Sequence, residues 1–321
     1  MTDEPDTAPD PRPRSPMRAW AQLLRLPNLL TVPGDPVAGA LLAGWAMLGP
    51  ASGNIVWAIA ASLCLYAAGL VANDWFDLTE DRRDRPSRPL PAGEVPPQIA
   101  LGSALGLTFV GIGCGFAASI PAGLTAAVLA ACVWAYDGGG KRLPVVGPLL
   151  MGACRAGSVW LGAAAVPNES MPWYSLMAAV VIGLYVAGVT SVARRETHPG
   201  PVSWRRWLPV VPLGLWAAFE FFGYGNLLLL VAFRPMRTVA FGLSGMAVVW
   251  AMFAARRLRQ PGGASVPWVI GLWIRGLFPV QAGFAALAGS LYPWFDGMFV
   301  ALLLLVLWPI SAHLGRKFYA S

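Results

Sequence analysis

The chain has 321 residues, of which 56% are apolar and only 12% are charged, and its formal net charge is +7. Soluble domains carry charge on about a quarter of their residues, so this composition excludes an ordinary soluble protein. Several stretches of about 20 residues lack charge, which is the length that crosses a bilayer as a helix. The composition therefore predicts an all-α, polytopic membrane helix bundle.

The first 17 residues are rich in Pro, Asp and Arg and contain no apolar segment. A signal peptide needs such a segment, so we expect residues 1–17 to form a disordered cytoplasmic tail and residues 18–321 to form the membrane domain. In chain order the expected membrane spans are 29–49, 55–76, 97–119, 122–136, 145–165, 172–193, 208–232, 238–255, 268–290 and 295–313.

Basic residues alternate strongly across these expected spans. Of the 23 Lys and Arg residues, 19 fall in segments that this map places on one side of the membrane. Loops rich in Lys and Arg stay in the cytoplasm, so we expect an N-terminus inside and a protein of the cytoplasmic (inner) membrane. The polar loops after the second, fourth and sixth spans then share the cytoplasmic face.

An acidic cluster follows the second span directly. Asp74, Asp77 and Asp81 are three and four residues apart, so they would share one face of a helix. Mg²⁺ prefers oxygen ligands and usually binds one or two carboxylates together with substrate phosphates. Arg85 and Arg88 follow at once and could contact diphosphate oxygens. The alternative is a solvated loop whose charges only pair with one another.

Aromatic side chains are expected in the spans beneath this cluster, namely Trp134, Tyr136, Trp160 and Tyr185. A diphosphate-binding head above a cavity suited to hydrocarbon indicates a polyprenyl diphosphate as substrate. In the predicted reaction, metal and arginine stabilise the leaving diphosphate, and a nucleophile captures the allylic cation. Aromatic faces can stabilise such a cation.

Residues 73–93, NDWFDLTEDRRDRPSRPLPAG, resemble the first aspartate-rich signature of the UbiA superfamily of intramembrane prenyltransferases. Arg25 to Asn28 resembles the motif that opens the family's first helix, and Tyr136 to Lys141 resembles its Tyr…Lys loop. The resemblance implies a nine-helix bundle with a central cavity open laterally to lipid. It also implies an Mg²⁺-dependent transfer of a polyprenyl group to a small hydrophobic or aromatic acceptor.

The resemblance, together with the charged residues around the matched motifs, assigns roles to individual residues of this chain. The metal ligands it implies are Asp74, Asp77, Asp81 and Glu196. The catalytic residues are Asp77, Asp81 and Arg88. The expected substrate-binding residues are Arg25, Asn28, Asn73, Arg85, Tyr136, Lys141, Arg155, Arg194 and Arg195.

The family's second aspartate-rich signature is altered here. Where the family has Asp-x-x-x-Asp, the loop at 191–200 reads SVARRETHPG, which leaves one carboxylate, Glu196. We hypothesise that Arg194 or Arg195 replaces part of the charge of a second Mg²⁺, because guanidinium matches phosphate geometry. The alternative is that both are ordinary cytoplasmic-side arginines. This loop, with residues 147–155, is most similar to the EboC branch.

Arg155 lies within an expected span, where an ionisable residue is a functional candidate. It could contact substrate phosphate or acceptor, or it could pair structurally with a carbonyl group.

Other classes of protein fit the sequence less well. A secondary transporter would place ionisable residues near the midplane on broken helices. A CDP-alcohol phosphotransferase would need an Asp-Gly and Ala-Arg arrangement that the segment after Asp74 lacks. A non-catalytic isoprenoid-binding or metabolite-transport relative is the remaining alternative. The expected partners are the lipid bilayer and the two substrates, with no nucleic acid.

Overall fold

The computed structural model describes residues 15–44, 54–167, 173–194, 204–223, 235–258, 265–292 and 297–319. Every regular element in these ranges is a helix, which confirms the all-α class. The first half contains α1 (Pro16–Leu23), α2 (Leu26–Leu29), α3 (Gly34–Leu42), α4 (Asn54–Phe76), α5 (Leu78–Asp84), α6 (Pro97–Ala118), α7 (Ile120–Asp137), η2 (Gly140–Arg142) and α8 (Val146–Ala164). The second half contains α9 (Trp173–Ala193), η3 (Trp204–Trp207), α10 (Val210–Gly223), α12 (Pro235–Arg257), α13 (Val266–Arg275), α14 (Leu277–Leu291) and α15 (Gly297–Tyr319).

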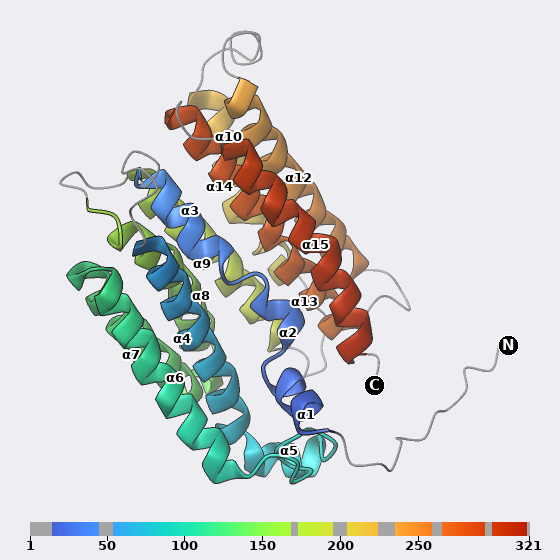
Figure 1. Ribbon diagram of the computed structural model, residues 1–321. Coiled ribbons are helices and arrows are strands. Elements are labelled where there is room, and N and C mark those ends of the chain that lie inside the picture. The colour runs from blue at the N-terminus through green and yellow to red at the C-terminus, as the bar shows by residue number, and fades with distance from the viewer. Residues whose placement is uncertain are drawn as a thin grey trace, which may run out of the picture.

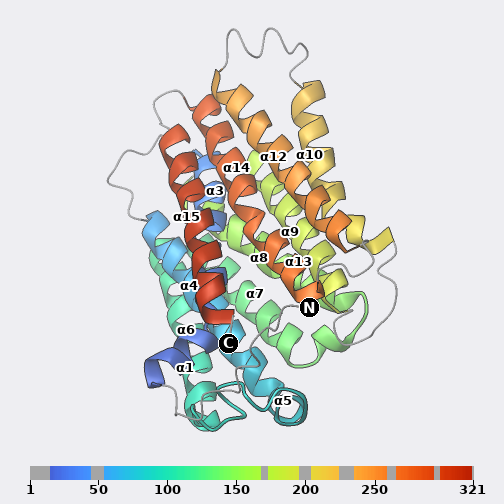
Figure 2. The ribbon, with the colours of Figure 1, turned by 90° about the vertical axis from the view of Figure 1, so that its right-hand side faces the viewer.

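The long helices run side by side as a bundle (Figure 1). Helix α4 packs mainly on α6, α8 packs on α9, and α14 packs on both α12 and α15. The short helix α3 joins the two halves because it contacts both α8 and α14. Helices α1 and α5 lie together at one end of the bundle, below the long helices in both Figure 1 and Figure 2. We call this end the α5 end.

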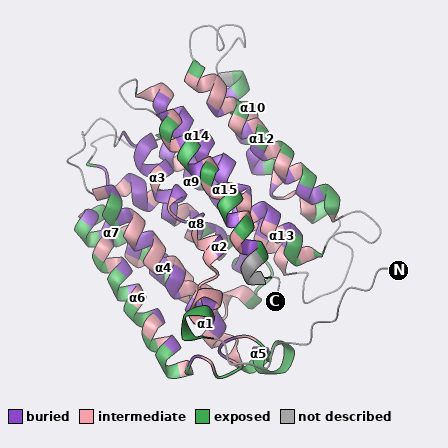
Figure 3. Ribbon diagram, turned by 45° about the vertical axis from the view of Figure 1, so that its right-hand side comes forward, coloured by how far each residue is buried: buried purple, intermediate pink, exposed green. Residues whose placement is uncertain are grey.

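The outer surface of the bundle is apolar. Helices α6, α7 and α15 carry many of the exposed residues in Figure 3, and large apolar side chains such as Phe109, Leu124 and Leu302 are among them. Helix α14 is buried along nearly its whole length. An apolar exterior of this extent needs a lipid environment.

Seven helical segments in the described ranges are long and apolar enough to cross a membrane. The sequence predicted ten spans, and seven of these correspond to the observed segments. The prediction for 145–165 corresponds to α8, whose hydropathy is lowered by Arg155 and Ser158. Within the described residues the prediction for 208–232 is met by α10 up to Gly223, and residues 224–232 lie outside them. The prediction for 29–49 was wrong as a single helix over its described part, residues 29–44.

The helix predicted over 29–49 is broken between α2 and α3. Pro33 lacks an amide hydrogen and disfavours helical geometry at Val32, which precedes it. The Thr31 hydroxyl donates to the Asn28 carbonyl at 2.8 Å, so it closes the short α2 turn. The break leaves the Thr31 carbonyl in the interior, where side chains from other helices satisfy it.

A second break separates α13 from α14 at Gly276. The Tyr185 hydroxyl donates to the Trp273 carbonyl at 2.6 Å, and the Trp250 indole donates to the Leu272 carbonyl at 2.8 Å. A Cβ atom on residue 276 would lie only 2.8 Å from the Tyr185 hydroxyl, so glycine is required by the close approach. The Tyr185 hydroxyl thus supplies a donor to the Trp273 carbonyl at the break, whereas the Leu272 carbonyl also accepts from the Gly276 amide.

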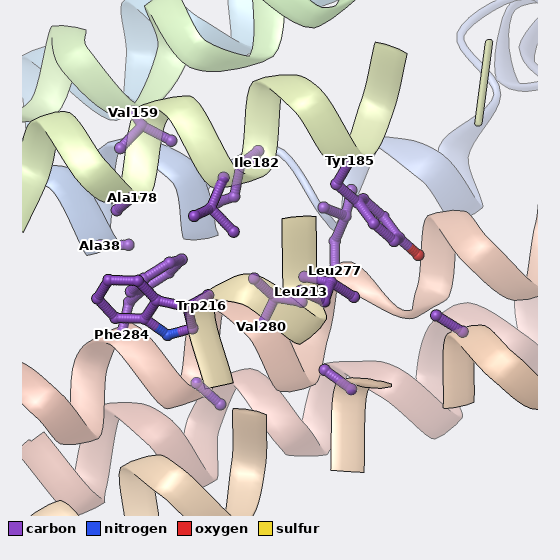
Figure 4. Close-up of a cluster of buried hydrophobic side chains, with 14 of the residues drawn as sticks. Ala38, Val159, Ala178, Ile182, Tyr185, Leu213, Trp216, Leu277, Val280 and Phe284 are labelled. Atoms are coloured by element: carbon purple, nitrogen blue, oxygen red, sulfur yellow. The ribbon is translucent and has the colours of Figure 1, made fainter. Parts of the chain in front are cut away.

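The largest buried apolar cluster lies where α9, α10 and α14 meet. In Figure 4, Trp216 lies against Phe284, with Ile182 and Val280 nearby. The rings of Trp216 and Phe284 are 5.1 Å apart. This packing fixes the second half of the bundle, against which the broken helices rest.

Candidate functional site

A cavity of about 280 Å³ lies between the two halves of the bundle and is lined from α2, α4, α7, α8, α9, α13 and α14. Its walls are largely apolar and include Leu65, Leu70, Val133, Val186, Val189 and Leu277. Polar residues occur toward its two ends. Arg25, Asn73, Tyr136 and Asp137 lie toward the α5 end, and Thr31, Ser62, Tyr66, Arg155 and Ser158 lie deeper. The cavity therefore has a polar head, an apolar middle and a second polar region.

The predicted acidic residues lie at the polar head, where each is paired with a cation. Arg25 donates to Asp74 at 3.2 Å, and Lys141 lies 2.6 Å from Asp77. Arg88 lies 2.7 Å from Asp81 and also 3.8 Å from Asp74. These contacts join segments far apart in sequence into one charged cluster.

The carboxylates are not on one continuous helix, contrary to the prediction. Helix α4 ends at Phe76 and α5 begins at Leu78, with Asp77 at the junction. The charged α5 cannot follow the apolar α4 into lipid, so the chain turns at the α5 end. Asp74 and Asp81 still meet Arg88, whereas Asp77 faces Lys141.

The outer side of α5 is solvent-facing. Arg83 donates to Asp84 at 2.8 Å there, and this hydrogen bond holds the pKa of the Asp84 carboxyl below its ordinary value. Arg85, predicted to bind substrate, is also exposed and does not line the cavity.

Arg25 reaches the cluster from an unusual backbone conformation. Its φ of 46° is in the left-handed region, which residues other than glycine rarely adopt. This geometry turns the chain between α1 and α2 and directs the side chain toward Asp74. Strain of this kind persists where surrounding structure holds it, and it often marks a functional site.

Lys141 is positioned by the loop around η2. Its ammonium group also donates to the Asn73 side chain at 3.1 Å. Arg194, just after α9, donates to the carbonyls of Arg142 and Leu143. Through these contacts Arg194 fastens the Lys141 loop to α9. Arg195 and Glu196, the other predicted residues of this loop, lie outside the described residues.

Asp137 was missed by the sequence reasoning. It ends α7, lines the cavity and is only 4% exposed, and its Oδ1 atom has no hydrogen-bond partner. The Tyr136 to Lys141 segment was singled out for its tyrosine and lysine. Asp137 lies between these two residues in the sequence, so its carboxylate was the signal that could have identified it as part of the site.

The predicted aromatic lining was mostly wrong. Among the described residues, Tyr136 lines the cavity, but Trp134, Trp160 and Tyr185 do not. Tyr66 on α4 lines it instead. A shift of one or two positions along a helix turns a side chain to a different face of that helix. Composition alone does not reveal which face lines the cavity.

The other predicted substrate residues divide by depth. Asn28 and Asn73 line the cavity toward its head, whereas Arg155 lies in the deeper polar region. Arg155 pairs with Asp35 at 2.9 Å and donates to the Thr31 carbonyl at 3.3 Å. Sequence reasoning had not identified Asp35 as its partner.

The oxygen-rich head has the donor chemistry that Mg²⁺ requires. Within the described ranges no three acidic, histidine or cysteine side chains converge into a ready metal site. Mg²⁺ needs only one or two carboxylates when a substrate supplies phosphate oxygens. The partnerless oxygen of Asp137 and the neighbouring cluster of Asp74, Asp77 and Asp81 therefore fit a magnesium–diphosphate group.

The sequence model of the UbiA prenyltransferase family matches residues 36–265. The digeranylgeranylglyceryl phosphate synthase of Methanopyrus kandleri is 34% identical over 169 residues, covering 50% of this chain and 59% of that protein. The match thus spans less than two thirds of this relative's length.

Two solved structures share the fold. The apo structure of a UbiA homolog from Aeropyrum pernix K1 has a TM-score of 0.60 at 20% identity, covering 80% of this chain and 96% of that one. A UbiA homolog from Archaeoglobus fulgidus, bound to GPP and Mg²⁺, has a TM-score of 0.56 at 14% identity, covering 82% and 99%. With the family match extending over most of the bundle, the chain belongs to the UbiA prenyltransferase family.

Proposed function

We propose that this protein is an intramembrane prenyltransferase. It transfers a prenyl group from a polyprenyl diphosphate to an aromatic or other small acceptor and releases diphosphate. The observation that carries the proposal is the apolar cavity whose head meets Arg25, Asn73 and Asp137, with Lys141 and Arg88 just beyond. Such a site suits a ligand with an anionic head and a hydrocarbon tail.

In the proposed reaction the allylic carbon–oxygen bond breaks, and its electron pair leaves with the diphosphate. Arg25, Arg88 and Lys141 stabilise the charge that develops on the leaving group. The allylic carbon then forms a bond to the acceptor, which loses a proton. The apolar walls exclude water, and the faces of Tyr66 and Tyr136 can stabilise the cation.

Mg²⁺ is the cofactor that we propose, held by Asp74, Asp77 and Asp81 with Asn73 and Asp137 nearby. When bound, it would neutralise negative charge on the diphosphate. The Archaeoglobus fulgidus homolog bound to GPP and Mg²⁺ supports this assignment by analogy. In this chain the carboxylates hold Arg25, Arg88 and Lys141 close to where the diphosphate would lie.

We further propose that the α5 end faces the cytoplasm in the cytoplasmic membrane. Basic residues are exposed at this end, namely Arg82, Arg83 and Arg142, and Arg256 is exposed at the end of α12. They agree with the rule that cytoplasmic loops are rich in basic residues. A water-soluble diphosphate product would then leave on the cytoplasmic side.

The proposal predicts that Asp77→Asn and Asp81→Asn each lower turnover about a hundredfold. Each carboxylate holds positive charge, from Mg²⁺ and a neighbouring cation, that stabilises the leaving diphosphate, and the variant loses part of it. Detergent-purified protein would be incubated with Mg²⁺, prenyl diphosphates and candidate acceptors, and diphosphate release and product mass would be followed. Asp84→Asn is the matched control, since Asp84 is exposed on the other side of α5 and pairs with Arg83.

Two outcomes would contradict the proposal. Full turnover in both cluster variants would show that the acidic residues are not part of the site. Tight binding of prenyl diphosphates without turnover, across a broad panel of acceptors, would instead indicate a non-catalytic isoprenoid-binding relative.

A further inference from the structure

One face of α4 connects the polar head of the cavity to its deeper polar region. Four α4 residues that line the cavity recur every three or four positions, namely Ser62, Tyr66, Gly69 and Asn73. This spacing places them on the same side of the helix. Tyr66 lies seven residues before Asn73, which corresponds to about 10 Å at 1.5 Å per residue. The deeper polar region therefore begins about two helical turns below the head.

Arg155 on α8 brings unused hydrogen-bond donors to this region. The residue is 5% exposed, its Nε atom lies 2.9 Å from an Asp35 carboxylate oxygen, and its Nη2 atom donates to the Thr31 carbonyl at 3.3 Å. A guanidinium group carries five N–H donors. Within the ranges that the structure describes, Nη1 makes no hydrogen bond. Because Arg155 lines the cavity, its remaining donors are available to a molecule bound there.

Tyr66 lies beside these donors. The Arg155 guanidinium carbon is 5.9 Å from the centre of the Tyr66 ring. Tyr66 lines the cavity, and its hydroxyl makes no hydrogen bond to any residue in the described part of the chain. A phenol hydroxyl can both donate and accept. Two neighbouring side chains in one part of the cavity thus have unused hydrogen-bonding capacity.

The ion pair between Arg155 and Asp35 determines which ligand group suits this region. Asp35 is fully buried and lies on the other side of the guanidinium from no added cation of its own; its partners are Arg155 and the Gln281 amide, which donates at 2.7 Å. A ligand carboxylate would bring a second negative charge to the same guanidinium, which is costly in a buried site. A hydrocarbon group would leave the free donors unpaired. A neutral carbonyl or amide group accepts from Arg155 without either cost.

Resting on the proposed function, we propose that Arg155 and Tyr66 bind the prenyl acceptor. We infer that the acceptor is a single-ring aromatic compound that carries a neutral carbonyl or amide group opposite its reacting edge. Its reacting atom must lie within contact distance of the allylic carbon, directly below the diphosphate head. The far side of the ring then extends down the cavity toward Tyr66 and Arg155.

The size of the cavity agrees with an acceptor of this class. Ligand pockets usually measure about 300–1,000 Å³, and the volume of about 280 Å³ found here is at the small end. Such a volume suits one ring beside the allylic end of the prenyl group. The rest of the tail would extend through the lateral opening to lipid that the family resemblance implies.

The test compares three phenols that share one ring and differ only at the para position. They are para-hydroxybenzamide, para-hydroxybenzoate and para-ethylphenol, which carry a neutral amide, a carboxylate and an apolar group. Each is titrated into detergent-purified protein with Mg²⁺ and geranyl thiolodiphosphate, a non-hydrolysable donor analogue, and the rise in melting temperature reports its affinity. We expect the wild type to bind para-hydroxybenzamide about tenfold more tightly than either of the other two.

Two variants test the two side chains separately. Tyr66→Phe keeps the aromatic face but removes the hydroxyl, so the affinity for para-hydroxybenzamide should fall about tenfold relative to para-ethylphenol. Asp35→Asn removes the charge that offsets Arg155, so the preference should change to para-hydroxybenzoate. Because Asp35→Asn leaves a buried charge unpaired and lowers stability, the Tyr66→Phe result decides by itself.

Tyr292→Phe is the matched control, because the Tyr292 hydroxyl donates to the Leu42 carbonyl at 3.2 Å and this residue does not line the cavity. It should keep the wild-type order of affinities. Equal affinities of the three phenols for the wild type, no binding of any of them, or an unchanged order in Tyr66→Phe would overturn the acceptor inference. The proposed function would stand in each case if geranyl thiolodiphosphate still bound. Failure of geranyl thiolodiphosphate and of inorganic pyrophosphate to stabilise the wild type would overturn the proposed function itself.

Discussion

Asp137 ends α7 with one carboxylate oxygen buried and without a hydrogen-bond partner. Buried polar atoms in folded proteins nearly always have a partner, so a partnerless one calls for a reason. A cation is the partner that suits a carboxylate oxygen at the head of this cavity. We therefore regard Asp137 as a contributor to the proposed magnesium–diphosphate site.

Asp137→Asn should raise the Mg²⁺ concentration needed for pyrophosphate binding about tenfold, as for other residues that support a metal site. The measurement is the Mg²⁺ concentration that gives half of the maximal thermal stabilisation in the presence of pyrophosphate. Asp84→Asn serves again as the control. An unchanged Mg²⁺ midpoint in Asp137→Asn would remove this residue from the site.

At the residue scale, the sequence predicted most of the charged side chains at the head, but it missed Asp137 and did not predict how the side chains pair. The spacing of Asp74 and Asp81 predicted a shared helix face, and Arg88, which was predicted to contact diphosphate, contacts both carboxylates. The pairing of Arg155 with Asp35 joins positions 120 residues apart, and no local pattern encodes it. Long-range pairs of this kind depend on the packing of α3 against α8.

The two broken helices are the main departures at the scale of elements. The sequence predicted α4, α6 and α7 to within two residues, because their apolar runs are bounded by polar or Pro-containing segments. It did not predict the breaks before α3 and before α14, although Pro33 to Pro36 and Arg275-Gly276 stand there. Pro and Gly are tolerated within membrane spans when neighbouring helices satisfy the freed backbone groups, so these residues alone do not mark a break. Each break is stabilised by side chains from other helices, such as Tyr185 at the Trp273 carbonyl.

Tyr185→Phe should destabilise the protein, because it leaves the buried Trp273 carbonyl without this donor. An unsatisfied buried group of this kind costs about 1–3 kcal/mol, which corresponds to a melting temperature several degrees lower. The check is a thermal melt in detergent. Ser290→Ala should have little effect, because Ser290 bonds locally to the Leu287 carbonyl within α14. Equal melting temperatures for Tyr185→Phe and the wild type would contradict this account of the break.

At the scale of the whole molecule, the position of the site at one end of the bundle ties function to orientation. The exposed residue Ser87 lies near the α5 end, whereas exposed Pro167 follows α8 at the opposite end. Because the two ends lie on opposite sides of a bilayer, the orientation is open to direct measurement.

A membrane-impermeant maleimide should label Ser87→Cys only in inside-out vesicles and Pro167→Cys only in right-side-out vesicles. The wild-type protein is the control, because its four native cysteines lie within helices of the bundle. The reverse labelling pattern would place the α5 end outside the cytoplasm and would contradict the predicted orientation.

The hydroxyl of Ser311 on α15 donates to the carbonyl of Pro27 on α2 at 2.9 Å. Helix α2 directly follows Arg25, so a segment made late in translation supports one made near the start. A nascent chain cannot form this bond until α15 has left the ribosome and entered the membrane. Substrate binding at the first helices should therefore mature late in biogenesis, after the rest of the bundle has assembled around them.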